Sequence, residues 1–128
     1  MAAATILIVD DEADIRDVLA LVLRDAGYRV LAAADGEAAI GLARENAVQL
    51  ALVDLKMPGI DGHETLLRLK AIHPALPVVI ATGCASTDVE MRSLDQGAFD
   101  CLWKPFDLQE LLKLVSRALG SGQARLAH

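Results

Sequence analysis

The segment LALVDLKMPGIDG, residues 50–62, decides how this sequence folds and where its polar chemistry lies. Its first four residues are continuously apolar, which is typical of a strand buried on both faces of a sheet. Asp54 follows at once, at the end of that strand. In the next residues Pro58 fixes its own φ, while Gly59 and Gly62 permit backbone angles that other residues avoid. The segment therefore predicts a carboxylate at the mouth of a buried strand, followed by a sharply turning loop.

Four further apolar runs lie on either side of this strand in the sequence. They are TILIV, RVLAA, PVVIA and FDCLW, at residues 5–9, 29–33, 77–81 and 99–103. The first three are nearly continuous, which again indicates strands buried on both faces, whereas the fourth alternates and suits an edge strand. Helical patterns separate the runs, so strand and helix alternate five times. This order predicts an α/β fold with a doubly wound five-stranded parallel sheet and right-handed connections.

The helical segments carry recognisable start signals. Asp35 and Asp107 stand before periodic apolar stretches as expected N-caps, and Asp61 with Gly62 opens the stretch 63–73. The last stretch, 108–119, has a strong 3.6-residue period. The segment 87–97 differs, because it contains only three large apolar residues. Thr87, with Glu90 three residues on, is its expected N-terminal signal. We expect this helix to be the least firmly docked of the set.

Length and composition are those of one intracellular domain. The chain has 128 residues and a net charge of −6, and no apolar run approaches the about 20 residues of a membrane-spanning helix. The N-terminus lacks the features of a signal peptide, so we expect a cytoplasmic protein without membrane contact. The acidic balance argues against nucleic-acid binding through this domain. We expect the domain to cover residues 1–119, residues 120–128 to form a flexible tail or linker stub, and Cys84 and Cys101 to be reduced thiols.

The carboxyl ends of the predicted strands collect polar residues. These are Asp10, Asp11 and Glu12 after the first strand, Asp54 after the third, Thr82 after the fourth and Lys104 after the fifth. Ligands of open α/β sheets bind outside these ends, so we expect one site. Neighbouring carboxylates raise one another's pKa, and the cluster therefore requires positive charge from Lys104 and a divalent cation. Oxygen ligands without His or Cys favour Mg²⁺. A salt bridge that merely orders the loops is the weaker alternative.

Asp54 is the predicted nucleophile of this site. A carboxylate beside Mg²⁺ and a fixed lysine can attack a phosphoryl group and form an aspartyl phosphate. The metal, Lys104 and the Thr82 hydroxyl can receive the charge of the transition state. The bond between Lys104 and Pro105 can be cis, which would direct the lysine. The three histidines are expected to be solvated surface residues: His63, His73 and His128.

The motifs ILIVDDE, LVDLKMPGIDG, VIATG and WKPF, at successive strand ends, resemble the receiver domain of bacterial two-component response regulators. The resemblance covers about residues 5–119 and implies a flavodoxin-like, CheY-like three-layer fold with strand order 2-1-3-4-5. It implies that Asp54 accepts phosphate from the phosphohistidine of a sensor histidine kinase or phosphotransfer protein. It also implies that Asp11 binds Mg²⁺ directly, Asp10 largely through water, and Lys56 through its main-chain carbonyl.

Such a domain is a signalling module of a phosphorelay that catalyses only its own phosphorylation and dephosphorylation. The resemblance implies that its output face is formed by the fourth helix, fifth strand and fifth helix, through which a partner or a second copy binds. One position departs from the family. Receivers usually carry Tyr or Phe three residues before the lysine, as the partner of a threonine switch, and here that residue is Cys101. Trp103, on the same side of the strand by alternation, either replaces this ring in part or packs statically.

Two other functions remain open from the residues. A small phosphatase of the haloacid-dehalogenase type also uses Asp, Mg²⁺, Thr and Lys, and Asp10 and Glu12 have the spacing of its nucleophile and acid, but this function leaves Asp54 unexplained. A scaffold that no longer needs phosphate is the second. The presence of all the site residues weighs against it, whereas Cys101 leaves it open.

Overall fold

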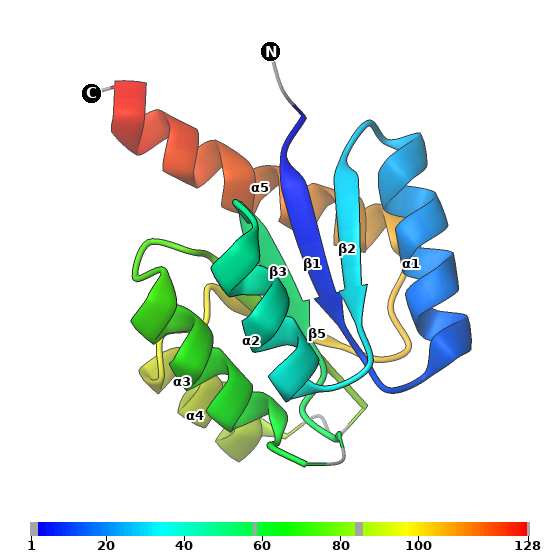
Figure 1. The fold of residues 1–128 in the computed structure, drawn as a ribbon, viewed down its shortest axis with the longest axis vertical. Helices are drawn as coiled ribbons and strands as arrows, with labels where there is room; N and C mark the ends of the chain where they lie inside the picture. The colour runs from blue at the N-terminus through cyan, green and yellow to red at the C-terminus, as the bar shows by residue number, and fades with distance from the viewer. Residues whose placement is uncertain (1–2, 58, 84–85, 128) are drawn as a thin grey trace.

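The computed structural model describes residues 3–57, 59–83 and 86–127. Five parallel strands form one sheet in the order β2-β1-β3-β4-β5, which confirms the predicted fold class and strand order (Figure 1). The strands are β1 (Thr5–Val9), β2 (Arg29–Ala33), β3 (Leu50–Val53), β4 (Val78–Thr82) and β5 (Asp100–Trp103). None of the helices in these ranges is both long and apolar enough to cross a membrane.

Helices cover both faces of the sheet and give three layers. They are α1 (Ala13–Asp25), α2 (Gly36–Glu45), α3 (Gly62–Ile72), α4 (Thr87–Asp95) and α5 (Leu108–Ala127). Alternate side chains of β1 show how the layers are built. Ile6 and Ile8 pack with residues of α1 and α5, whereas Leu7 and Val9 pack with residues of α2 and α3. Because β1 is covered on both faces, its sequence is apolar at every position.

β2 does not match the prediction of a strand buried on both faces. It lies at one edge of the sheet, and its residues Arg29 and Ala32 are exposed. The prediction was wrong here because a continuous run of small and apolar residues does not distinguish an edge strand from a central one. β5 lies at the other edge, as its alternating sequence predicted.

Side-chain caps begin α2 and α3, whereas α1 has no side-chain cap. The carboxylates of Asp35 and Asp61 accept hydrogen bonds from Ala38 N–H and Glu64 N–H, at 2.8 and 2.9 Å. The helix α4 begins one residue earlier than a cap at Thr87 would give: Ser86 is its N-cap, and the Ser86 hydroxyl accepts from Val89 N–H at 3.1 Å. Either hydroxyl can cap a helix, and the chain uses the one that leaves Thr87 in the first turn.

The helix α5 continues past its predicted end at residue 119. It runs to Ala127, and the division into a domain at 1–119 and a tail or linker stub at 120–128 stays a prediction. Gln, Ala, Arg and Leu in this stretch favour helix, and each glycine costs only about 1 kcal/mol relative to alanine once a helix is already formed. His128 lies outside the described residues.

His63 and His73 are not the solvated residues that we expected. His63 is buried, and its Nε2 lies 3.1 Å from Ser93 Oγ of α4. The half-buried ring of His73 lies with its Nε2 3.0 Å from the main-chain oxygen of Ala43. Each ring meets a partner about thirty positions away in sequence, which no local pattern reveals.

The environment of His63 predicts a loss of stability in acid. Burial lowers the pKa of His63, the charge of Arg92 lowers it further, and Asp61 opposes them only in part. The unfolded chain therefore binds a proton near pH 6.5 that the folded protein resists. We expect the stability contributed by His63 to be complete above that pH and to decrease as the pH falls below it. Urea unfolding from about pH 8 to about pH 5 measures this slope.

A matched pair of variants isolates the residue. His63→Gln keeps an N–H donor but does not titrate in this range, so it should flatten the slope. His73→Gln makes the same change at the C-cap of α3 and shows how much of any effect comes from the substitution itself. An unchanged slope in His63→Gln would contradict this assignment.

Candidate functional site

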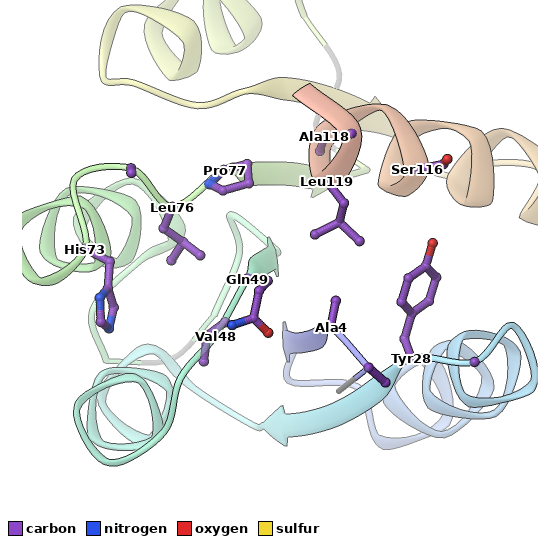
Figure 2. Close-up of a pocket in the computed structure, with 14 residues that line it drawn as sticks. Ala4, Tyr28, Val48, Gln49, His73, Leu76, Pro77, Ser116, Ala118 and Leu119 are labelled. Carbon is purple, nitrogen blue, oxygen red and sulfur yellow. The ribbon is translucent and has the colours of Figure 1, made fainter. Parts of the chain in front are cut away.

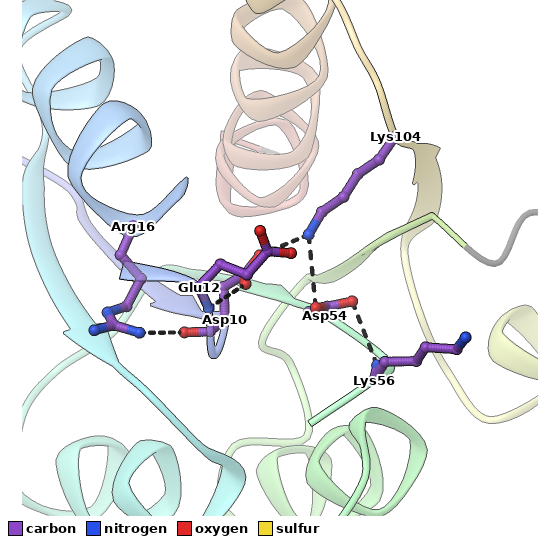
Figure 3. Close-up of polar contacts among 6 residues, drawn as sticks. All are labelled: Asp10, Glu12, Arg16, Asp54, Lys56 and Lys104. Atoms are coloured by element: carbon purple, nitrogen blue, oxygen red, sulfur yellow. Dashed lines mark hydrogen bonds and ion pairs between the residues drawn. The ribbon is translucent and has the colours of Figure 1, made fainter. Parts of the chain in front are cut away.

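The predicted site residues lie at the carboxyl ends of four strands, and Figure 3 shows three of them, Asp10, Asp54 and Lys104. Asp10 follows β1, Asp54 follows β3, Thr82 ends β4 and Lys104 follows β5. Main-chain hydrogen bonds fix these positions relative to one another. Asp54 N–H donates to the Val9 carbonyl at 2.9 Å, and Lys104 N–H donates to the Thr82 carbonyl at 2.8 Å. The sheet register therefore places the carboxylates and the lysine together.

The ammonium group of Lys104 lies between two carboxylates. Its Nζ is 2.7 Å from Asp10 Oδ2 and 3.6 Å from Asp54 Oδ2 (Figure 3). The carboxylate side chains are only 4% and 8% exposed, so this ion-pair cluster is shielded from solvent. The prediction that Asp10, Asp54 and Lys104 share one site agrees with this arrangement.

Sequence reasoning missed one residue that organises the site. Arg16, on the first turns of α1, donates from its guanidinium Nη1 to the Asp10 carbonyl at 2.7 Å. Glu12 N–H donates to Asp10 Oδ1 at 3.0 Å. These two contacts hold the main chain and the carboxylate of Asp10 toward Lys104. The sequence did contain a signal for Arg16: it is a basic residue in the first turns of a helix that follows a run of acidic residues.

Burial and charge shift the pKa values of the central pair. Burial raises the pKa of Asp54, and the carboxylates of Asp10 and Asp11 raise it too, against the lowering effect of Lys104 and the Lys56 N–H. For Lys104, burial alone lowers the pKa, but the hydrogen bond to Asp10 and the charge of Asp54 outweigh it and raise the pKa. The site thus holds a charged lysine and more negative charge than that lysine neutralises.

A group of three carboxylates in this edge can hold a cation. One oxygen atom from each of Asp10, Asp11 and Glu12 lies within 4.8 Å of the others. Asp54 does not belong to this group, although Lys56 N–H contacts its Oδ1 at 3.4 Å. Glu12, which our expected ligand set left out, is therefore a member of the cluster. Oxygen donors alone suit Mg²⁺, which prefers few carboxylates and retained waters.

The loop after Asp54 has the backbone geometry that its sequence predicted. Gly59 has φ +80°, in the left-handed region that favours glycine. At Gly62, a Cβ would lie 2.5 Å from Leu55 Cα and against the Asp54 carbonyl, so the first turn of α3 packs directly on the strand end. The Lys104–Pro105 peptide is cis, as we considered from the sequence. Pro58 lies outside the described residues.

The predicted switch residues differ in exposure. Thr82 is buried and pairs in register with Trp103, which is 46% exposed. Cys101 is half-buried and packs against the apolar cluster beneath α2, α3 and α4. Trp103 therefore has large exposed surface next to the end of β4.

A separate hollow lies at the opposite ends of the strands, beside their amino termini (Figure 2). Its volume is about 770 Å³, and its wall includes Tyr28, Gln49 and His73. The described residues that line it include no carboxylate, lysine or arginine. Gln49 and His73 already bind main-chain groups, Thr5 N–H and the Ala43 oxygen. The charged chemistry of this domain therefore lies at the carboxyl edge and not in this hollow.

The fold and the site together define a doubly wound α/β domain with an acidic cluster and a lysine at the carboxyl ends of its strands. The sequence profile of the response regulator receiver domain matches residues 6–116. The chain therefore belongs to the response regulator receiver domain family, the signalling modules of two-component systems.

Individual relatives agree with this assignment. The chain is 40% identical over 114 residues to the transcriptional regulatory protein ZraR of Klebsiella oxytoca, covering 89% of this chain and 26% of that protein. It superposes on a CheY-like receiver domain from Methanospirillum hungatei with TM-score 0.94 at 30% identity, covering 97% and 99% of the two chains. For the chemotaxis protein CheY4 of Vibrio cholerae the TM-score is 0.88 at 32% identity, with coverage of 92% and 100%. The chain thus spans about a quarter of the curated relative and the full length of the solved domains.

Proposed function

We propose that Asp54 accepts a phosphoryl group from a phosphohistidine of a sensor histidine kinase or phosphotransfer protein. The observation that carries this proposal is the shielded Asp54 carboxylate, 8% exposed, with Lys104 Nζ at 3.6 Å and the carboxylate of Asp10 on the same lysine. A lysine that already sits beside the nucleophile can bind an oxygen of the incoming phosphoryl group. The domain thereby serves as the receiving partner of a phosphorelay.

The transfer exchanges one bond for another. A carboxylate oxygen of Asp54 bonds to phosphorus while the phosphorus–nitrogen bond of phosphohistidine breaks. The electron pair of that bond passes to the donor imidazole, which leaves as neutral histidine once its ring carries a proton. The new charge on the phosphoryl oxygens is received by Lys104 and by the Thr82 hydroxyl.

We propose Asp10, Asp11, Asp54 and the main-chain carbonyl of Lys56 as the residues that hold Mg²⁺. The mutually close oxygen atoms of Asp10 and Asp11 support this set, and they extend it to Glu12. When bound, the ion supplies positive charge to carboxylates and phosphoryl oxygens that Lys104 alone does not neutralise. The raised pKa of Asp54, caused first by burial and then by its acidic neighbours, agrees with a site built to receive a cation.

The surface beside Lys104 suits a protein donor. A groove next to this lysine is lined by apolar residues of α1 and of the segment that leads into α5: Ile15, Val18, Leu19, Pro105, Phe106 and Leu108. Val18 and Leu108 are among the exposed large hydrophobic residues of the domain. An apolar surface flanking the mouth of the site allows the donor to dock while its phosphohistidine reaches Asp54.

The direct test is phosphorylation of the isolated chain. Incubation with acetyl phosphate and Mg²⁺ is expected to give one phosphoryl adduct per chain, detected as intact mass. Chelation of Mg²⁺ by EDTA should suppress the adduct, because the acidic cluster then lacks its compensating charge. The same adduct should form from a phosphorylated histidine kinase. A folded chain that forms no adduct with either donor would favour the phosphate-independent scaffold.

A phosphatase function has less support. Its nucleophile would be Asp10, whose carboxylate is 4% exposed and already bound to Lys104 and to Glu12 N–H.

We propose that phosphorylation of Asp54 changes the face formed by α4, β5 and α5, where Met91, Leu94 and Trp103 are exposed. This face would then bind a partner or a second copy, and sedimentation of the chain with and without its phosphoryl group measures the latter.

A further inference from the structure

The helix α4 is attached to the domain by a polar side chain. Among residues 88–95, Ser93 alone is buried, and it is fully inaccessible to solvent. The large apolar residues Met91 and Leu94 point outward, with 58% and 42% of their surface exposed. Val89 is only partly buried against the core, so the position of α4 depends on this packing and on the contacts that Ser93 makes.

Ser93 connects α4 to the neighbouring helix α3 (Figure 1). Its hydroxyl donates to the Val89 carbonyl at 2.8 Å, which uses the one proton that a serine hydroxyl has. The oxygen is then left as an acceptor for His63, whose Nε2 lies 3.1 Å away. His63 therefore carries its proton on Nε2 and donates from α3 to α4. Both groups are buried, so separating them leaves two polar groups without water.

We propose that the contact between His63 and Ser93 is a latch that holds α4 in its unphosphorylated position and that phosphorylation of Asp54 releases. The inference rests on the proposed phosphorylation of Asp54. Thr82, which would bind the phosphoryl group, ends β4, and α4 begins only five residues later at Thr87. We therefore expect a displacement of Thr82 toward the phosphoryl group to shift the start of α4 as well. A buried hydrogen bond yields in one step over a small displacement, so the latch has two discrete states.

Amide hydrogen exchange without any phosphoryl donor tests the attachment. In His63→Leu and in Ser93→Ala we expect the amides of α4 to exchange about tenfold faster, while those of β1 and α2 keep their rates. The double variant should add little to either single change, because both remove the same contact. His63→Gln, which keeps a donor, should restore slow exchange. Ser116→Ala and His73→Leu make the same substitutions away from α4 and should have no effect there.

The affinity for beryllofluoride with Mg²⁺, a non-covalent mimic of the phosphoryl group, tests the coupling. Because the mimic no longer has to release the latch, it should bind the two latch variants about tenfold more tightly than wild type. Unchanged α4 exchange, or faster exchange spread evenly over the domain, would overturn the latch. Loosened α4 with unchanged mimic affinity would reduce the contact to a structural role. If wild type neither bound the mimic nor formed an adduct, the proposed function would fail, and exchange would still report whether His63 and Ser93 hold α4.

Discussion

An Asp54→Asn variant is expected to form no phosphoryl adduct with acetyl phosphate or with a phosphorylated kinase. The amide that replaces the carboxylate is not a nucleophile toward phosphorus, and no other described carboxylate shares the position between Lys104 and Lys56 N–H. Intact mass with Mg²⁺ present measures the result. Asp25→Asn, at the exposed end of α1, is the matched control and should be phosphorylated like wild type.

The same variant should also be more stable than wild type at pH 7. Burial, together with Asp10 and Asp11, raises the pKa of Asp54 above its ordinary value of 3.8 despite Lys104. The contribution of Asp54 to stability is therefore present below that ordinary value and is lost as the pH rises through the folded-state pKa. Asparagine cannot ionise, so the urea midpoint of Asp54→Asn at pH 7 should be higher than that of wild type. A lower urea midpoint for Asp54→Asn than for wild type would contradict this electrostatic explanation. A phosphoryl adduct on Asp54→Asn would show that Asp54 is not the nucleophile.

A Gly62→Ala variant is expected to damage both the fold and the site. The added methyl would lie 2.5 Å from Leu55 Cα and against the Asp54 carbonyl, and neither of these main-chain atoms can move without displacing β3's end. Overpacking of this kind costs about 3 kcal/mol, which lowers the Tm of a domain of this size by on the order of 10 °C. Phosphorylation by acetyl phosphate should slow as well, because Asp54 moves relative to Lys104.

The matched control is Gly41→Ala in α2. A Cβ at Gly41 meets nothing within 4 Å, so alanine should be stabilising there, by about 0.5–1 kcal/mol from helix propensity. Thermal unfolding of the two variants separates a steric effect from a general effect of losing glycine. Equal stability of Gly62→Ala and wild type would mean that α3 can shift away from the strand end without cost.

The sequence predicted the sheet and the edge at which its chemistry lies. A run such as TILIV has an apolar residue at every position, which only a strand covered on both faces requires, and such strands imply helical connections. Once the strands are parallel, their carboxyl ends meet at one edge, so Asp10, Asp54, Thr82 and Lys104 follow from their places after the runs. The cap Asp35 was predictable for a similar reason, because its partner is a main-chain group three residues away.

Errors arose where a partner lies far away in sequence or where local patterns are ambiguous. The run RVLAA did not reveal that β2 is an edge strand, because small residues tolerate both exposure and burial. Residues 120–127 continue α5 although they lack an apolar period, since extending a helix that is already formed needs no new nucleation step.

By itself, then, the sequence determined the α/β fold, the carboxyl-edge site and the family resemblance, because periodicity and strand ends are local properties of the chain. Only the tertiary structure determined which side chains are in contact with one another. It placed Lys104 Nζ on Asp10 at 2.7 Å and farther from Asp54, brought Arg16 to the Asp10 carbonyl, and buried His63 against Ser93. These contacts join residues on different elements, and their geometry depends on how helices pack on the sheet. Packing sums many weak contacts over the whole domain, and no short stretch of sequence encodes that sum.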